Sequence, residues 1–113
     1  THSCTAIGDE SNATETCILY DDMVDTAGTL TKAADIMTNA GAASVRAIVS
    51  HAVMSDPASS RVDESSLTEL IFTNSIPFTK SCKKARVLSI AELFADTIRR
   101  VYAGESISEQ YLL

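Results

Sequence analysis

Short runs of aliphatic and β-branched residues alternate with helical or polar stretches along this chain, and that alternation limits the folds it can adopt. Four such runs are predicted to be strands, at residues 17–20, 44–50, 67–75 and 86–90. Strands that alternate with helices at this spacing predict right-handed parallel βαβ units. The predicted fold class is therefore α/β, with a mostly parallel sheet of doubly wound type flanked by helices.

Two helices are predicted between and after these runs. The first starts at Thr29, where apolar residues begin to recur at helical spacing, and it ends at the stop signal Asn-Ala-Gly. The second starts at Ser89, which forms a capping box with Glu92, and Gly104 is its predicted C-cap. Its apolar face is formed by Ile90, Leu93, Phe94, Ile98 and Val101.

The run at residues 17–20 contains only apolar residues without alternation, which is typical of a strand covered on both faces. The polar residues 1–16 before it are predicted to be an irregular lead-in or the tail of an upstream segment. Residues 17–113 are predicted to form the domain. The stretch 56–62 is predicted to be a short helical turn or a loop.

Composition excludes several function classes. The formal net charge is −6, whereas proteins that bind nucleic-acid phosphates concentrate Lys and Arg. No apolar run approaches the length that spans a bilayer. The 3 cysteines and 2 histidines lack the spacing of a zinc site or a redox pair. We expect reduced thiols in a cytoplasmic protein, with no nucleic-acid or membrane partner.

A cluster of acids follows the first strand. Asp21 and Asp22 lie at its end, and the small residues 25–29 form the turn before the next helix. Backbone N–H groups of such a turn can bind a phosphate, and carboxylates accept hydrogen bonds from sugar hydroxyls or attract Mg²⁺. A sugar phosphate would satisfy both the N–H groups of the turn and the carboxylates. The alternative is that the acids only cap the helix and face solvent. Neither a Walker loop nor a dinucleotide fingerprint is present.

The stretch CILYDDMVDTAGT resembles the phosphoribosyl pyrophosphate-binding motif of type I phosphoribosyltransferase folds. The stretches TLTKAADIMTNAGAASVRAIVSHAVMS, TNSIP, LFADTIRR and GESIS extend the likeness. Together they resemble the C-terminal domain of ribose-phosphate pyrophosphokinases, also called phosphoribosyl pyrophosphate synthetases. This resemblance covers the chain from about Ile7 to its end. It implies that residues 17–113 are the phosphoribosyltransferase-like C-terminal domain of a longer two-domain subunit.

The resemblance implies transfer of the diphosphoryl group of ATP to the 1-hydroxyl of ribose 5-phosphate, with Mg²⁺ as cofactor. Asp21 and Asp22 would hold the ribose hydroxyls directly or through metal-bound water, and no residue is expected to bind the metal directly. The family's ATP-binding segments, catalytic histidine and mobile Lys/Arg loop lie upstream of this motif. We therefore expect no catalytic residue in this chain and no activity of the chain alone. The 5-phosphate would be wrapped by Asp25, Thr26, Ala27, Gly28 and Thr29.

The resemblance also implies a regulatory site for phosphate or ADP between subunits, with Ser106 and Ser108 as donors. The alternative for this segment is a helix cap followed by a tail. His51 is predicted to organise its loop rather than to bind a ligand. Family members assemble as homo- or hetero-oligomers, commonly hexamers built from dimers.

Three functions remain open from the sequence. The first is a catalytic pyrophosphokinase subunit, of which this chain is the ribose 5-phosphate-binding half. The second is a non-catalytic regulatory or assembly subunit that keeps the fold. The third is a phosphoribosyltransferase that consumes the activated sugar. The intact stretch DDMVDTAGT argues against a degenerate ribose site, and TNSIP and GESIS argue against the third function.

Overall fold

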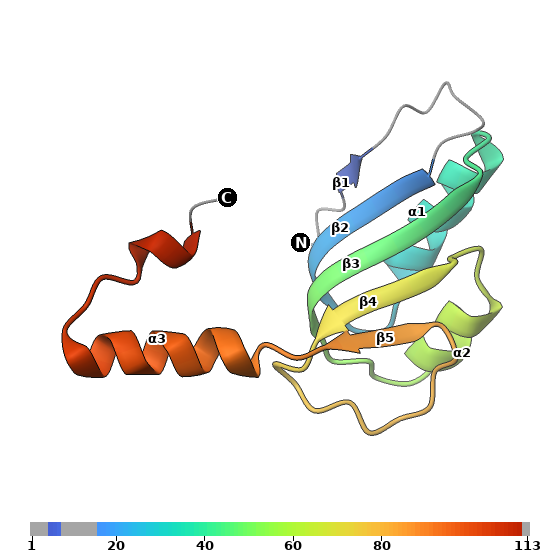
Figure 1. The fold of residues 1–113 in the computed structure, drawn as a ribbon. Helices are drawn as coiled ribbons and strands as arrows, with labels where there is room; N and C mark the ends of the chain where they lie inside the picture. Colours follow the sequence, from blue (N-terminus) through green and yellow to red (C-terminus); the bar gives the residue numbers. More distant parts are fainter. Residues whose placement is uncertain (1–4, 8–15, 112–113) are drawn as a thin grey trace.

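The computed structural model describes residues 5–7 and 16–111, and a five-stranded sheet lies at its centre (Figure 1). β1 pairs antiparallel with β2, whereas β2, β3, β4 and β5 run parallel to one another. The predicted mostly parallel α/β sheet is confirmed. Residues 5–7, which were predicted to be irregular, form an edge strand. In their order across the sheet, the strands are β1 (Thr5–Ile7), β2 (Thr16–Val24), β3 (Ser44–Ala52), β4 (Glu69–Thr73) and β5 (Ala85–Leu88).

Two helices cover one face of this sheet. α1 (Gly28–Asn39) joins β2 to β3, and α2 (Ala58–Glu64) joins β3 to β4. Because the strands follow one another in chain order, successive crossovers of one hand place both helices on the same side. Buried residues of both helices accordingly share one core with the strands. The doubly wound arrangement is therefore wrong for the described elements, since it needs helices on both faces.

The core lies between the strands and α1. Leu30, Ala34 and Met37 recur at helical spacing on α1, and each is buried against the sheet. The helix ends where Gly41 takes a φ of 104°, as the stop signal predicted. The largest fully buried side chains are Phe72, Leu19, Met54, Leu67, Leu70, Val45, Val49 and Val62.

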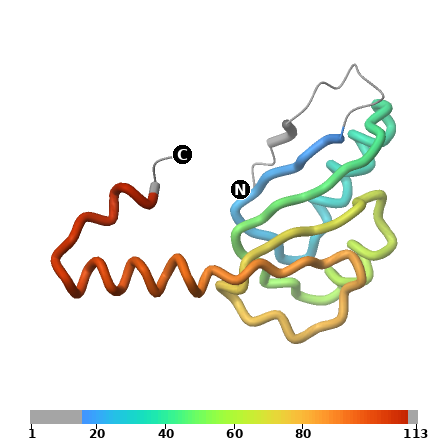
Figure 2. The backbone as a smooth tube through the Cα atoms, viewed as in Figure 1, coloured from blue at the N-terminus to red at the C-terminus, as the bar shows by residue number. Residues whose placement is uncertain are grey.

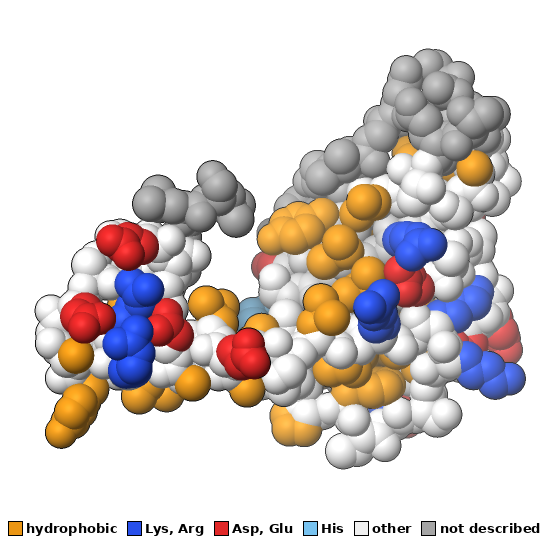
Figure 3. All heavy atoms as spheres, viewed as in Figure 1, with side chains coloured by type: hydrophobic (Ala, Val, Ile, Leu, Met, Phe, Trp, Pro, Cys, Tyr) orange, Lys and Arg blue, Asp and Glu red, His pale blue; other side chains and the backbone are white. Residues whose placement is uncertain are grey.

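The other face of the sheet is open in the described part of the chain. Along β2, Cys17 and Leu19 are buried, but Tyr20 is 51% exposed. The predicted coverage of residues 17–20 on both faces is therefore wrong, although the strand itself is confirmed. Figure 3 shows apolar side chains over this face, interrupted by charged ones. Arg46 and Glu69 form an ion pair there across β3 and β4.

α3 (Ala91–Ala103) extends away from the sheet and leads to a short 3₁₀ turn, η1 (Ser108–Tyr111) (Figure 1). The radius of gyration of 16.2 Å exceeds the ~13 Å expected of a compact chain of about 100 residues. The predicted apolar face is present, and Phe94, Ile98 and Val101 on it are more than half exposed. No helix in the described part is long and apolar enough to cross a bilayer.

The ends of α3 test the predicted caps. Gly104 is the C-cap and is left-handed, with a φ of 71°, as predicted. The capping box is wrong, because the N-cap residue is Ile90 and no side chain caps the helix. The Ser89 hydroxyl accepts the N–H of Ala91 at 3.2 Å, whereas the capping box predicts a bond to the N–H of Glu92. The side chain of Asn74 accepts the N–H of the N-cap residue Ile90 at 3.0 Å.

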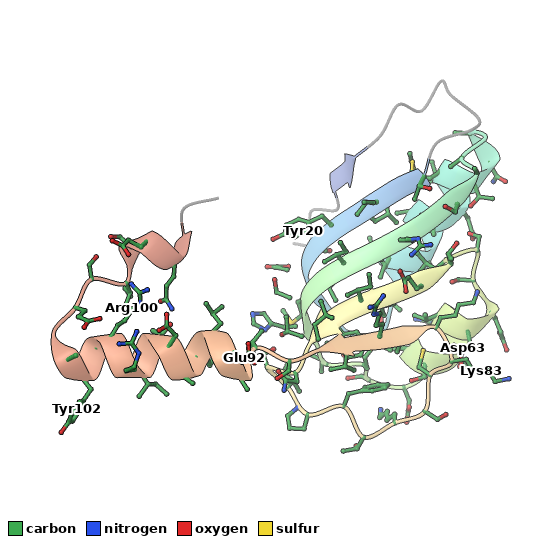
Figure 4. All side chains as sticks on the ribbon, viewed as in Figure 1. Tyr20, Asp63, Lys83, Glu92, Arg100 and Tyr102 are labelled. Atoms are coloured by element: carbon green, nitrogen blue, oxygen red, sulfur yellow. The ribbon has the colours of Figure 1, made fainter. Side chains whose placement is uncertain are left out.

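The connection from β4 to β5, which Figure 2 shows looping out from the sheet, is tied to α2 through Asp63. The carboxylate of Asp63 accepts the backbone N–H groups of Lys83 and Lys84, and Figure 4 shows Asp63 beside Lys83. Desolvation opposes ionisation of Asp63, but these hydrogen bonds outweigh it and lower its pKa. Burial raises the pKa of the Cys82 thiol, and the hydrogen bond to Asp63 raises it further.

Candidate functional site

A hollow of about 130 Å³ lies where β2 passes into α1. Six of the seven predicted ribose 5-phosphate residues line it, and Asp22 does not. Sequence reasoning missed three further lining residues: Met23 and Val24 lie inside the stretch CILYDDMVDTAGT, and Leu30 follows it directly. The hollow is lined by Asp21, Met23, Val24, Asp25, Thr26, Ala27, Gly28, Thr29 and Leu30.

Asp21 is the one buried charged side chain of the described residues, with 7% of its surface exposed. It lies inside β2 rather than after it, because the strand continues through Val24 in register with Ala52. Its Oδ1 accepts the backbone N–H of Asp22 at 2.8 Å. Asp22 is exposed and absent from the hollow, as expected of neighbouring residues on a strand, whose side chains point to opposite faces.

The alternative that these acids cap α1 is wrong. The N-cap residue of α1 is Ala27, no described side chain caps the N–H groups of the first turn, and no acid lies in that turn. Asp25 is exposed and lies at the rim of the hollow. The carboxylates of Asp21 and Asp25 thus remain available to a ligand.

Residues 25–29, which we call the β2–α1 loop, present backbone N–H groups to the hollow. The first N–H groups of any helix lack partners inside it, which here concerns Gly28, Thr29 and Leu30. No acceptor among the described residues bonds to them. The partial positive charge of a helix N-terminus adds to the attraction for an anion. The exposed hydroxyls of Thr26 and Thr29 can donate further hydrogen bonds.

Ala27 gives this loop its shape. Its φ of 65° and ψ of 11° are left-handed, a conformation that costs a residue with a Cβ about 1–2 kcal/mol. Its side chain is buried, with 4% of its surface exposed. A strained backbone is maintained only where its surroundings fix it, and such residues gather at ligand sites. Packing of Ala27 against the core is one such constraint.

Arg61 of α2 supplies a second constraint. Its Nη1 donates a hydrogen bond of 3.1 Å to the carbonyl oxygen of Thr26. A Cβ added at Gly28 would lie 3.4 Å from the same Nη1, so the guanidinium passes close beside the glycine. Sequence reasoning did not single out Arg61, since a lone arginine in a short polar stretch carries no motif.

The other predicted residues lie outside this hollow. His51 near the end of β3 shares a hydrogen bond of 2.6 Å with the Ser75 hydroxyl, which connects this strand end to the segment after β4. Its loop-organising role stays a prediction. Ser106 and Ser108 follow α3, at the end remote from the sheet (Figure 1). Their exposed hydroxyl oxygens are 2.7 Å apart. The guanidinium of Arg100 donates to the Ser106 carbonyl at 3.1 Å.

Comparisons with known proteins place these features in a family. The model of the phosphoribosyl synthetase-associated domain matches residues 3–112. The chain is 62% identical, over 83% of its length, to a ribose-phosphate pyrophosphokinase of Porphyromonas gingivalis. A ribose-phosphate pyrophosphokinase of Helicobacter pylori is 50% identical over the same share. The chain spans 30% of the length of each of these relatives.

A solved structure agrees with the fold. The phosphoribosylpyrophosphate synthetase from Mycobacterium smegmatis superposes with a TM-score of 0.80 at 42% identity. The match covers 87% of this chain and 33% of that one. Sequence and fold therefore agree over nearly the whole described region, and the chain belongs to the phosphoribosyl synthetase-associated domain family.

Proposed function

We propose that this chain is the ribose 5-phosphate-binding part of a ribose-phosphate pyrophosphokinase, which makes phosphoribosyl pyrophosphate from ATP and ribose 5-phosphate. The observation that carries the proposal is the hollow, which Asp21 lines together with the start of α1, where the first backbone N–H groups have no partner among the described residues. An anion and a polyol fit this pairing of donors and acceptors. The curated relatives are pyrophosphokinases, which favours this activity over that of a phosphoribosyltransferase.

Within this proposal the 5-phosphate accepts hydrogen bonds from the β2–α1 loop, and the ribose hydroxyls donate to Asp21. Asp22 lies outside the hollow and is left out of the proposed contacts. The phosphoryl transfer itself depends on groups for ATP that this chain is not proposed to supply. Catalysis of that reaction is mostly positioning and charge neutralisation. We accordingly place this chain as the C-terminal domain of a two-domain cytoplasmic subunit and expect no turnover from it alone.

Magnesium is part of the same proposal. Mg²⁺ prefers oxygen ligands, keeps several waters and is commonly bound by one or two carboxylates together with substrate phosphates. Among the described residues, no group of three or more His, Cys, Asp or Glu side chains converges. The donors at the hollow, Asp21 and Asp25, fit a water-mediated contact. The metal would neutralise phosphate charge, while Asp21 orients the ribose.

The segment at Ser106 and Ser108 is proposed as a second, regulatory phosphate site formed between subunits of an oligomer. The two exposed hydroxyls lie together, and Arg100, which is ion-paired with Asp96 and Glu109, donates to the backbone of the same turn. Figure 4 shows the side chain of Arg100 directed from α3 toward the segment that follows it. The family resemblance supports an assembly of the hexameric type.

Titration calorimetry with ribose 5-phosphate tests the main proposal in the complete subunit that carries this domain. Gly28→Val adds branched methyl groups where the ligand must approach the backbone, and we expect affinity to fall at least about tenfold, or ~1.4 kcal/mol. Ala43→Val is the matched control, because Ala43 is exposed and lies beyond the opposite end of α1. Equal affinity in both variants would remove the β2–α1 loop from the site.

A further inference from the structure

The β2–α1 loop is held by few side chains. Thr31 donates its hydroxyl to the carbonyl oxygens of Ala27 at 2.8 Å and Gly28 at 3.2 Å. Thr31 belongs to α1, so these bonds stay within the same helix start. Among the described residues, Arg61 is the one side chain of another element that forms a hydrogen bond to this loop, at the carbonyl of Thr26.

This bond sets the direction of a donor on the opposite side of the loop. The peptide between Thr26 and Ala27 is trans, so its C=O and N–H point in opposite directions. The C=O faces Arg61, which lines an outer hollow with Lys32 on the α2 side of α1. The N–H of Ala27 consequently points away from α2, and Ala27 lines the ligand hollow but not the outer one.

The local sequence does not favour this orientation by itself. Ala27 occupies the left-handed region, where a residue with a Cβ is strained. Without an external partner for the Thr26 carbonyl, rotation of this peptide would relieve the strain and turn the Ala27 N–H out of the hollow. Arg61 opposes that rotation with a charged donor, and Gly28 leaves room for the guanidinium to approach.

We propose that Arg61 is a positioning residue for the 5-phosphate: it fixes the Thr26–Ala27 peptide so that the Ala27 N–H is directed at the phosphate. This inference rests on the proposed ribose 5-phosphate site. Arg61 does not touch the ligand in this scheme. The 5-phosphate does not itself react, and we expect the Ala27 N–H to hold it equally in the ground state and the transition state, a contact that lowers KM and leaves kcat unchanged.

Steady-state kinetics of the complete subunit test the inference. Arg61→Gln removes the charged donor, and we expect the KM for ribose 5-phosphate to rise about tenfold with little change in kcat or in the KM for ATP, the pattern of lost uniform binding. Arg61→Lys keeps the charge but not the planar guanidinium. Its KM for ribose 5-phosphate should therefore lie between those of the unmodified subunit and Arg61→Gln. Lys32→Gln is the matched control, because it removes a neighbouring positive charge that makes no hydrogen bond to the loop.

The outcomes separate this inference from the function it rests on. An unmodified subunit that does not bind ribose 5-phosphate would overturn the proposed function. Normal use of ribose 5-phosphate by both the unmodified subunit and Arg61→Gln would overturn only the role of Arg61. An equal rise of both substrate KM values would also overturn it, as would an equal effect of Lys32→Gln. If Arg61→Gln does not fold, Arg61→Lys decides: a selective rise of at least about threefold supports the role, and an unchanged KM refutes it.

Discussion

The packed sheet and the projecting helix α3 follow the same amphipathic rules but end in opposite environments. Leu30, Ala34 and Met37 on α1 are buried, whereas Leu93, Phe94 and Ile98 on α3 are about half exposed or more. α1 meets the strands beside it in the chain, and α3 meets no covering element in the described part. A periodic apolar face therefore predicts a helix, but it does not say what covers that face.

The two regions also hold their polar groups differently. The first N–H groups of α1 have no partner among the described residues, and the loop before the helix is held by backbone bonds and Arg61. The end of α3 pairs charge with charge, since Asp96 contacts Arg99 and Arg100 within the helix. Free donors suit a ligand, whereas mutual ion pairs stabilise a local shape. Figure 4 shows Tyr102 projecting outward from α3, with 94% of its surface exposed.

The largest expected effect is a difference in the free energy of unfolding between two substitutions, one in the core and one on α3. Phe72 is 1% exposed and packs edge-on against Phe78, with ring centroids 5.2 Å apart. Phe72→Ala should lower the free energy of unfolding by about 3–5 kcal/mol, because it leaves a cavity. Phe94→Ala, at 56% exposure, should change it by less than about 0.5 kcal/mol in the isolated chain.

Urea denaturation of the 113-residue chain measures both variants. A cost for Phe94→Ala that approached that for Phe72→Ala would show that α3 packs against the sheet in solution. The comparison between the two regions would then fail.

Some of this fold was predictable from the sequence because its signals are local. The runs at β3 and β4 contain β-branched residues among other apolar ones, and the stop after α1 contains a glycine that takes a positive φ. β1 was missed because three residues carry too little pattern, and its pairing with β2 is a tertiary contact. The extension of β2 through Asp21 was missed because Asp disfavours strands, whereas pairing with β3 overrides that preference.

The candidate site likewise contains some residues that a local motif predicts and others that only the tertiary fold brings together. Residues 25–29 are contiguous, so a motif shows them directly. The different positions of Asp21 and Asp22 depend on how far the strand continues, and Arg61 reaches the loop from α2, 35 positions away in sequence. Contacts of this kind depend on the tertiary fold.

A smaller effect, on the use of ribose 5-phosphate, is expected for Asp21 in the proposed ligand site. In the complete subunit, Asp21→Ala should reduce the use of ribose 5-phosphate by about 10- to 150-fold, since a charged hydrogen bond is worth about 1.5–3 kcal/mol. Thermal stability should change little, because Asp21 bonds only a neighbouring backbone N–H among the described partners. Asp35→Ala is the control, a surface carboxylate on α1 that bonds Ser66.

Steady-state kinetics on ribose 5-phosphate, paired with a thermal melt, measures both quantities. A destabilised Asp21→Ala variant with normal kinetics would assign Asp21 to folding rather than to ribose.

The smallest effect concerns the charge pairs of α3 and depends on pH. The hydrogen bond from Arg99 lowers the pKa of Asp96 below its ordinary value of 3.8; desolvation opposes this shift, and Arg100 adds to it. Asp96 also accepts the side-chain amide of Gln110 at 2.7 Å, which connects α3 to η1.

A carboxyl whose pKa is depressed in the folded state contributes stability above its unfolded pKa and loses it as pH falls through the folded pKa. The contact between α3 and η1 should therefore persist through pH 3.8 and weaken only below it. The side-chain amide resonances of Gln110 report this transition by NMR, and added salt should weaken the ion pairs that hold Asp96, because these groups are partly exposed. Asp96→Asn should abolish the transition, whereas Glu109→Gln, which removes a neighbouring acid paired with Arg100 at 3.5 Å, should leave it. A midpoint above pH 3.8 in the unmodified chain would show that Arg99 and Arg100 do not hold Asp96 in solution, and that the end of α3 is as free of partners as its apolar face.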